Sequence, residues 1–401
     1  MSRIIFLIDV NNAFLSWTAV NLLKKGYKVD IRNICSVIGG DESKRHGIVL
    51  ARSIPSKSKG IITGETLHMA RKKCPNLKIY PPEYDLYQEM SNSLFTLLKE
   101  YTPDIEIFSI DECFIDYTKV KGLYGDEIEF AEMIKKQIKE RLGFTVNVGI
   151  GNNKLCAKMA SELKKPDMVH TIYDHEVKDK MWPLPINKLF GVGKKTEEIL
   201  RKLKITTIEE LANYDLDKLS KYFKNRALSL IESANGIDDS LVMTNKEEQK
   251  GISKSTTLEK DLKSKEEINK VLHKLADYLG QTIRKQNKHA YTISVNLRDR
   301  YFKSYSHQIK LRNATNITEE IYNTAKQLLD EMWHKEPIRL VGISLSDLVN
   351  KTSHQISLFE DIETRDKLNM LDKTMDELKE KYGSDIIKKA SSVKNKREND
   401  V

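Results

Sequence analysis

The segment that decides the fold is Ile105-Glu106-Ile107-Phe108-Ser109-Ile110-Asp111-Glu112-Cys113-Phe114-Ile115-Asp116-Tyr117. Two short runs rich in β-branched and aromatic residues flank an adjacent pair of acids, Asp111 and Glu112. This pattern predicts a β-hairpin with both carboxylates at its turn. Neighbouring side chains in a straight strand point to opposite faces, whereas at a tight turn both can face one metal ion.

A third acid, Asp9, ends the continuous apolar run at residues 4–8, which is typical of a buried strand. Burial of a carboxylate is costly unless a cation compensates for it. Convergence of Asp9, Asp111 and Glu112 on divalent metal would provide that compensation. Taken alone, each acid has a structural alternative to metal binding. Asp9 could form a turn or cap a helix, and Asp111 and Glu112 could simply be solvated at a turn.

The composition is that of an ordinary soluble protein with a basic surface. A chain of 401 residues is long enough for two or more domains. No apolar run is long enough to span a bilayer and the N-terminus leads directly into the first strand, so we expect a cytoplasmic protein with no membrane partner. The net charge of +9 favours a polyanionic partner, although basic faces are often merely solvated.

The order of elements predicts a ferredoxin-like unit in the first 150 residues. If an insertion at about 30–75 is set aside, the order is strand, helix, strand, strand, helix, strand. We expect an antiparallel sheet covered on one face by helices, in which the first strand neighbours the hairpin, so that Asp9 can meet Asp111 and Glu112. Within the insertion, residues 55–60 are expected to form a basic loop.

Two further basic motifs follow the predicted sheet. The helix expected from Lys154 to about Lys165 also carries Lys158, and lysines four residues apart share a face, although such a stripe is usually exposed to solvent. The run Gly191-Val192-Gly193-Lys194-Lys195 predicts a helix-hairpin-helix whose backbone N–H groups can approach a phosphate. A plain tight turn is the alternative for that run.

The second half of the chain predicts a second α/β unit at about 251–350, with its sheet covered on one face only. One alternating face of its strands is polar and basic, which suits contacts to a nucleic-acid backbone and suits solvent equally well. A final helix carries apolar residues at spacings of three and four, and is expected to pack on this same chain rather than on a partner. These residues are Leu368, Leu371, Met375, Leu378 and Tyr382.

Taken together, these motifs resemble a known family. The run from Ser109 to Asp116 is similar to the Ser-Ile-Asp-Glu signature of the Y-family translesion DNA polymerases, in the bacterial branch that includes DinB and UmuC. Five further stretches match the family in the same order: 9–14, 39–45, 81–87, 149–166 and 191–195.

The resemblance implies an α+β multidomain fold shaped as a right-handed polymerase. It would have a ferredoxin-like palm, small fingers, a helical thumb with a helix-hairpin-helix, and an α/β little finger. The expected limits are 1–10 and 81–168 for the palm, 11–80 for the fingers, 169–243 for the thumb, 244–250 for a linker, 251–350 for the little finger and 351–401 for a tail.

The resemblance also implies low-fidelity, template-directed DNA synthesis past damage, with primer–template DNA and deoxynucleoside triphosphates as substrates. Asp9, Asp111 and Glu112 would be catalytic and would hold two Mg²⁺ ions, together with the backbone carbonyl of Val10. Nucleotidyl transfer is an in-line displacement that needs such metal ions, and Mg²⁺ prefers hard oxygen ligands.

The residues that contact the nucleotide match the family pattern less completely than the acids do. Phe14 falls at the steric-gate position, where a ring excludes ribonucleotides, and Lys158 and Lys165 fall near the triphosphate. Ile54 and Lys57 stand where many members have Tyr and Arg, and Lys57 keeps the charge of Arg but loses its bidentate fork. Contacts to the DNA backbone are expected from the hairpin residues Gly191, Gly193, Lys194 and Lys195.

The run Gln355-Ile356-Ser357-Leu358-Phe359 resembles the peptide by which bacterial polymerases dock on the sliding clamp. The implied contacts are Gln355, Ser357, Leu358 and Phe359, with two adjacent apolar anchors in an extended segment. A polymerase with this peptide would be cytoplasmic and associated with the nucleoid.

Two other functions are compatible with parts of the sequence. The departures at Ile54 and Lys57 are compatible with a catalytically weak adaptor bound to DNA and the sliding clamp, whereas the intact set of acids argues against one. Gly39-Gly40-Asp41-Glu42 superficially resembles the turn of a diguanylate cyclase, but a basic run follows it where an apolar strand would be required.

Overall fold

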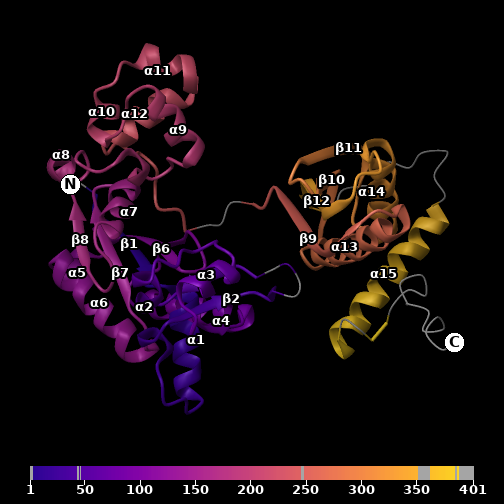
Figure 1. Cartoon of the computed structure of the whole chain (residues 1–401), viewed down its shortest axis with the longest axis horizontal. Helices are drawn as coiled ribbons and strands as arrows, with labels where there is room; N and C mark the ends of the chain where they lie inside the picture. The colour runs from indigo at the N-terminus through magenta and orange to yellow at the C-terminus, as the bar shows by residue number, and fades with distance from the viewer. Residues whose placement is uncertain are drawn as a thin grey trace. The chain divides into compact units, whose positions relative to one another are not determined.

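A computed structural model describes residues 3–42, 45, 47–244, 248–350, 362–383 and 386–387. The chain divides into two compact units. The first comprises residues 1–42 and 47–246, and the second comprises 43–46 and 247–401 (Figure 1). Each unit is described by itself.

A five-stranded sheet forms the centre of the first unit, in the order β5-β6-β1-β7-β8. Its strands are β1 (Ile5–Val10), β5 (Ile105–Ile107), β6 (Glu112–Asp116), β7 (Val146–Gly151) and β8 (Val169–Ile172). Strand β1 is buried along its whole length and pairs antiparallel with both β6 and β7, whereas β7 and β8 are parallel. The predicted pairing of the first strand with the hairpin is confirmed.

Helices cover both faces of this sheet, so the expectation that only one face would be covered was wrong. On one face, Phe6 and Ile8 join a large core with residues of α1 (Ala13–Lys24), α4 (Tyr84–Lys99) and α6 (Glu127–Leu142). The other face is covered by α7 (Lys154–Glu162). The side chains of β1 are apolar on both faces of the sheet, so both faces must be covered.

Close packing of α7 against the sheet depends on glycine. Ile5 and Leu7 of β1 and Phe114 of β6 form a second small core with Ala157 of α7. A Cβ added at Gly149 of β7 would lie 2.0 Å from the carbonyl oxygen of Ala157, so no side chain fits there. The helix backbone therefore sits directly on the strand.

The insertion forms a three-stranded sheet in the order β3-β2-β4. Its elements are η1 (Ile31–Asn33), β2 (Ser36–Gly39), β3 (Val49–Arg52), α2 (Ile54–Ser58), α3 (Leu67–Lys73) and β4 (Lys78–Tyr80). The expectation of a loop at residues 55–60 was wrong, because helix α2 occupies most of it. The Ser53 hydroxyl caps α2 by accepting from the Ser56 N–H at 3.1 Å, and Pro55 lies in its first turn, where its fixed φ is favourable.

Short helices complete the first unit. Residues of η3 (Tyr117–Lys119) and α5 (Lys121–Tyr124) join the large core. The others follow β8, and all of them except η4 share a separate core with α7. They are η4 (Asp174–Glu176), α8 (Val177–Lys180), η5 (Ile186–Lys188), α9 (Lys194–Lys202), α10 (Ile208–Ala212), α11 (Leu216–Phe223) and α12 (Arg226–Ala234). Helix α10 begins with a capping box between Thr207 and Glu210.

The second unit contains a four-stranded antiparallel sheet in the order β11-β10-β12-β9. Its elements are β9 (Gly251–Leu262), α13 (Lys265–Lys285), β10 (Lys288–Asp299), β11 (Ser304–Thr315), α14 (Thr318–Met332) and β12 (Ile338–Asn350). The α/β unit predicted at about 251–350 corresponds to these strands and helices.

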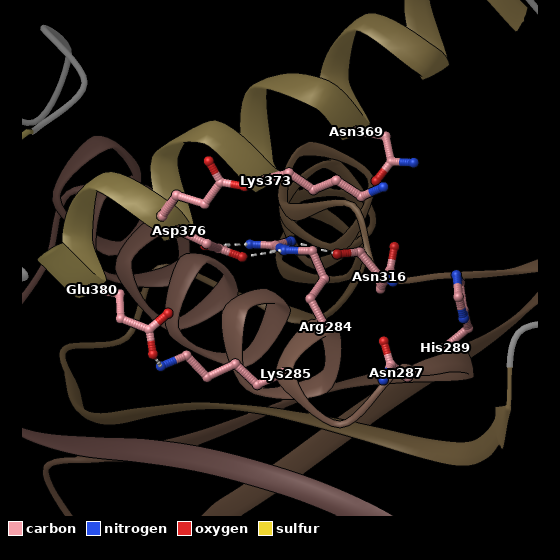
Figure 2. Close-up of a pocket in the computed structure, with 10 residues that line it drawn as sticks. Arg284, Lys285, Asn287, His289, Asn316, Asn369, Lys373, Asp376 and Glu380 are labelled. Carbon is pink, nitrogen blue, oxygen red and sulfur yellow. Dashed lines mark hydrogen bonds and ion pairs between the residues drawn. The ribbon is translucent and has the colours of Figure 1, made fainter.

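The final helix, α15 (Ile362–Tyr382), contacts α13 and α14 through charged groups. Figure 2 shows Arg284 of α13 reaching Asp376 of α15, and Lys285 reaching Glu380. The guanidinium of Arg284 donates to Asp376 at 2.7 Å and to Asp372 at 3.0 Å, and its side chain is only 7% exposed. Helix α15 thus does pack on its own chain, as predicted.

Ion pairs join α15 to the rest of its unit. Besides the Arg284 contacts, Lys379 pairs with Asp277 at 2.6 Å and Arg365 with Glu320 at 2.8 Å. Asp372 also accepts from the backbone N–H of Thr318 at 2.7 Å and so caps α14 from another helix. In the apolar stripe, Leu371 and Tyr382 are exposed, whereas Leu368, Met375 and Leu378 are partly buried. Ionic contacts therefore hold α15 together with part of its apolar stripe.

Arg284→Met is expected to release α15 and uncap α14, because it removes the donor shared by two carboxylates. We expect a loss on the order of 1–3 kcal/mol in the docking free energy. Hydrogen exchange should show faster exchange of the Thr318 amide and of α15. Lys285→Met, at an exposed pair, is the control, and unchanged protection in Arg284→Met would contradict this account.

Candidate active site

Asp9 and Glu112 lie directly opposite each other on paired strands. The antiparallel register of β1 and β6 aligns these two residues at the end where β1 stops. Among the described residues, the carboxylates of Asp9, Glu112 and Glu162 form one group whose ligand oxygens all lie within 4.8 Å of one another. The carboxylate of Asp9 is buried, with the side chain 6% exposed.

Asp111 joins this site through its main chain. Its carbonyl accepts from the Val10 N–H at 3.0 Å, which places its backbone beside the end of β1. Its carboxylate accepts from the Ser109 hydroxyl at 2.6 Å and lies outside the group formed by the other three acids in the described structure. The structure therefore brings Asp9 and Glu112 together directly, because Glu112 already belongs to β6 whereas Asp111 is the last residue of the turn.

Glu162 was not predicted from the sequence. It is the last residue of α7, four residues after Lys158 and three before Lys165. That spacing places it near both lysines and is the signal that could have identified it. Its side chain is 48% exposed, so it forms the open side of the acidic group.

Lys158 and Lys165 both reach the acidic group. The helix expected to run to about Lys165 ends at Glu162, so Lys165 reaches the group from just beyond α7. The ammonium group of Lys158 lies 2.5 Å from Glu112, 3.3 Å from Glu162 and 3.4 Å from Asp9. That of Lys165 lies 2.7 Å from Asp9 and 2.9 Å from Glu162. Lys154 is separate from this group, since it pairs with Glu106 at 2.8 Å.

The ionisation of this group is shifted by burial and by charge. Burial, together with the neighbouring Asp9 carboxylate, raises the pKa of Glu112 to about 7, although the hydrogen bond from Lys158 opposes this shift. Burial by itself would lower the pKa of Lys158, but contacts with Glu112 and Asp9 outweigh it and raise the value. Glu112 therefore titrates near neutral pH while Lys158 stays charged.

Several contacts fix the position of α7. Asn153 caps the helix by accepting from the Cys156 N–H at 2.8 Å, and its amide donates to the Gly236 carbonyl at 2.7 Å. Asp238 accepts from the Leu155 N–H at 3.1 Å. The start of α7 is thus held on the residues that follow α12. Lys158, one turn farther along the helix, is thereby directed to the ends of β1 and β6.

Phe14 lies in the first turn of α1 and is partly buried. Its ring stacks on Tyr87 of α4 at a centroid distance of 4.4 Å and with an interplanar angle of 7°. Asn12 adopts the left-handed region at φ 53°, which Asn tolerates, and donates to the Arg52 carbonyl at 2.6 Å. These contacts fix the orientation of the Phe14 ring, which lies five residues after Asp9 in the chain.

The remaining predicted contacts lie on exposed surface. Ile54 and Lys57 are exposed on α2. Gly191, Lys194 and Lys195 are exposed as well, and Gly191 has φ 87°, a conformation that favours glycine at the turn before α9. Gly193 is the N-cap of α9. The predicted clamp peptide at 355–359 lies outside the described residues.

The acidic group suits a hard divalent cation. Its potential metal ligands are carboxylate oxygens, and Val10 follows Asp9 directly in the chain. The ammonium groups of Lys158 and Lys165 lie against these oxygens. Carboxylates this buried require positive charge, and oxygen donors are those that Mg²⁺ prefers.

None of the helices in the described part of the chain has both the length and the apolar character that crossing a membrane requires.

Family models match three segments of the chain. The impB/mucB/samB family matches residues 8–162, the IMS family HHH motif residues 174–205, and the impB/mucB/samB family C-terminal domain residues 249–358. The second match coincides with the predicted helix-hairpin-helix.

Relatives match almost the whole chain. A protein named DNA polymerase IV from Clostridium acetobutylicum is 52% identical over 388 residues, covering 96% of this chain and 97% of the relative. DNA polymerase IV 1 of Bacillus subtilis is 33% identical, covering 98% of this chain and 94% of the relative. A solved structure, a Y-family DNA polymerase chimera, aligns with a TM-score of 0.75 at 23% identity over 87% of this chain and 100% of that one, which shows the shared fold.

The paired acids at the ends of β1 and β6, the helix-hairpin-helix and the near-complete match to these relatives agree with one another. The chain therefore belongs to the impB/mucB/samB family, the Y-family DNA polymerases.

Proposed function

We propose that this Y-family polymerase carries out template-directed, low-fidelity DNA synthesis past damaged bases, with two Mg²⁺ ions held by Asp9, Asp111, Glu112 and the Val10 carbonyl. The observation that carries the proposal is the pairing of Asp9 with Glu112 at the ends of adjacent strands. Beside them, the Asp111 carbonyl accepts a hydrogen bond from the Val10 N–H. When bound, the metal ions would supply an activated primer hydroxyl and stabilise charge on the phosphorus.

The other residues would position the substrates. Lys158 and Lys165 lie next to the acidic group and would bind the triphosphate, and Lys57 of α2 would add a third positive charge. The Phe14 ring would lie against C2′ of the incoming sugar. A ring already stacked on Tyr87 cannot easily move aside for a 2′-hydroxyl.

The hairpin and the clamp peptide would bind the larger partners. Backbone N–H groups at Gly191 and Gly193, with Lys194 and Lys195, would contact DNA phosphates at the exposed start of α9. Gln355, Ser357, Leu358 and Phe359 would dock on the sliding clamp. Association with the nucleoid would follow from these contacts.

The adaptor alternative gains no support from the site, since the acids and lysines needed for catalysis lie together. Ile54 and Lys57 are exposed on α2 and are not members of the acidic group. The predicted domain limits also stay a proposal. Strand β8 pairs with β7 although it lies beyond residue 168, and α1 contributes to the core beneath the sheet although it follows residue 10.

Asp9→Asn, Asp111→Asn and Glu112→Gln are each expected to reduce primer extension by about 10³-fold or more, since metal ions contribute several kcal/mol to the transition state. DNA binding should be retained. The measurement is extension of undamaged and abasic templates with Mg²⁺. Asp116→Asn, at the far end of β6, is the control, because Asn can still cap Thr118. Normal extension by any of the three variants would remove that acid from the metal site.

Phe14→Ala is expected to raise ribonucleotide incorporation relative to deoxynucleotide by about 10- to 100-fold, the equivalent of relieving 1–3 kcal/mol of steric overlap. Competition between the two nucleotides on one primer measures it. Tyr27→Ala removes an exposed ring just after α1 and serves as the control. Unchanged sugar discrimination in Phe14→Ala would exclude this residue as the gate.

Replacing Leu358 and Phe359 together by Ala is expected to abolish stimulation of synthesis by the sliding clamp, because apolar anchors dominate such contacts. Distributive extension without the clamp should be unaffected. Ile356→Ala, at a non-anchor position of the same peptide, is the control. Equal loss with and without the clamp would mean that the segment is structural.

A further inference from the structure

Glu162 contacts both lysines of the active site. Lys158 lies against Glu112 and Asp9, and Lys165 lies against Asp9. Each lysine has Glu162 as an additional partner, at 3.3 Å for Lys158 and 2.9 Å for Lys165. Both ammonium groups therefore contact Glu162 in addition to the acids that are proposed to bind metal.

The position of Glu162 differs from that of the acids on the strands. Asp9 and Glu112 are largely buried at the edge of the sheet, with side chains 6% and 16% exposed. Glu162 ends α7 and is 48% exposed, on the side open to solvent. Contacts with Lys165 and Lys158 outweigh its desolvation and lower its pKa, so it remains an anion.

The lysines and the metal ions require the same oxygens. Asp9 and Glu112 must release the ammonium groups before those oxygens are available to a divalent ion. Lys158, whose side chain is only 12% exposed, would then be a poorly solvated charge, which is costly without a partner. Glu162 already contacts both ammonium groups and can keep them as the other two carboxylates release them.

We infer that Glu162 is a positioning residue that retains Lys158 and Lys165 when Asp9 and Glu112 bind metal, and that afterwards competes with the triphosphate for Lys165. This role rests on the proposed metal and nucleotide sites. It has two consequences of opposite sign, since Glu162 favours metal binding and opposes nucleotide binding. A direct metal ligand would instead favour both.

Glu162→Gln in the full-length chain tests this role. Binding of Mn²⁺ without nucleotide, followed by electron paramagnetic resonance of the free ion, should weaken by about two- to fivefold, the range of partly exposed ion pairs. Deoxynucleotide binding to a complex with a dideoxy-terminated primer, which prevents turnover, should be at least as tight as in the unaltered protein. Glu132→Gln removes a matched carboxylate three residues before Lys135 and should change neither value.

Two results would overturn the inference. Mn²⁺ binding that is unchanged or stronger in Glu162→Gln would make the residue a bystander, and weaker binding of both Mn²⁺ and nucleotide would make it a metal ligand. Thermal unfolding of the variant verifies that it is folded, and Glu162→Ala provides a second variant with the same expected signs. Failure of the metal site itself is distinguishable, because Asp9→Asn would then leave Mn²⁺ binding intact.

Discussion

The structure of the active site depends on two carboxylates that face each other across adjacent strands. Asp9 and Glu112 are brought together by the register of β1 and β6, and like charges at that separation are unfavourable without positive charge nearby. The protein supplies Lys158 and Lys165 from α7 and from the segment after it. The same electrostatic demand that would attract divalent metal is therefore met here by Lys158 of α7 and by Lys165 just beyond it.

Helix α7 links the site to the rest of the first unit. Its backbone rests on Gly149, where no side chain would fit, and its N-terminus is capped by Asn153 and by Asp238, which follows α12 in the chain. Because its contacts lie at both ends and along one face, the helix has little freedom to turn. That restraint keeps two flexible lysine side chains within reach of the acids.

The second unit uses charge differently. Its sheet and two helices form a conventional apolar core, whereas α15 is held by Arg284, Asp372 and neighbouring ion pairs. These charged side chains are largely buried, and salt screens buried ion pairs much less than exposed ones. The attachment of α15 therefore depends on ion pairs that are shielded from solvent.

Sequence alone determined the order of the elements, the acids at the ends of β1 and β6 and the turn before α9, because apolar periodicity and turn residues are local properties. Tertiary structure alone decided three things: that α7 covers the second face of the sheet, that Glu162 joins the acidic group whereas Lys154 pairs elsewhere, and that ion pairs join α15 to α13 and α14. Each depends on which surfaces meet across long separations in the chain. Pairing partners such as Arg284 with Asp376 leave no periodic signal in the sequence, so only the folded chain could identify them.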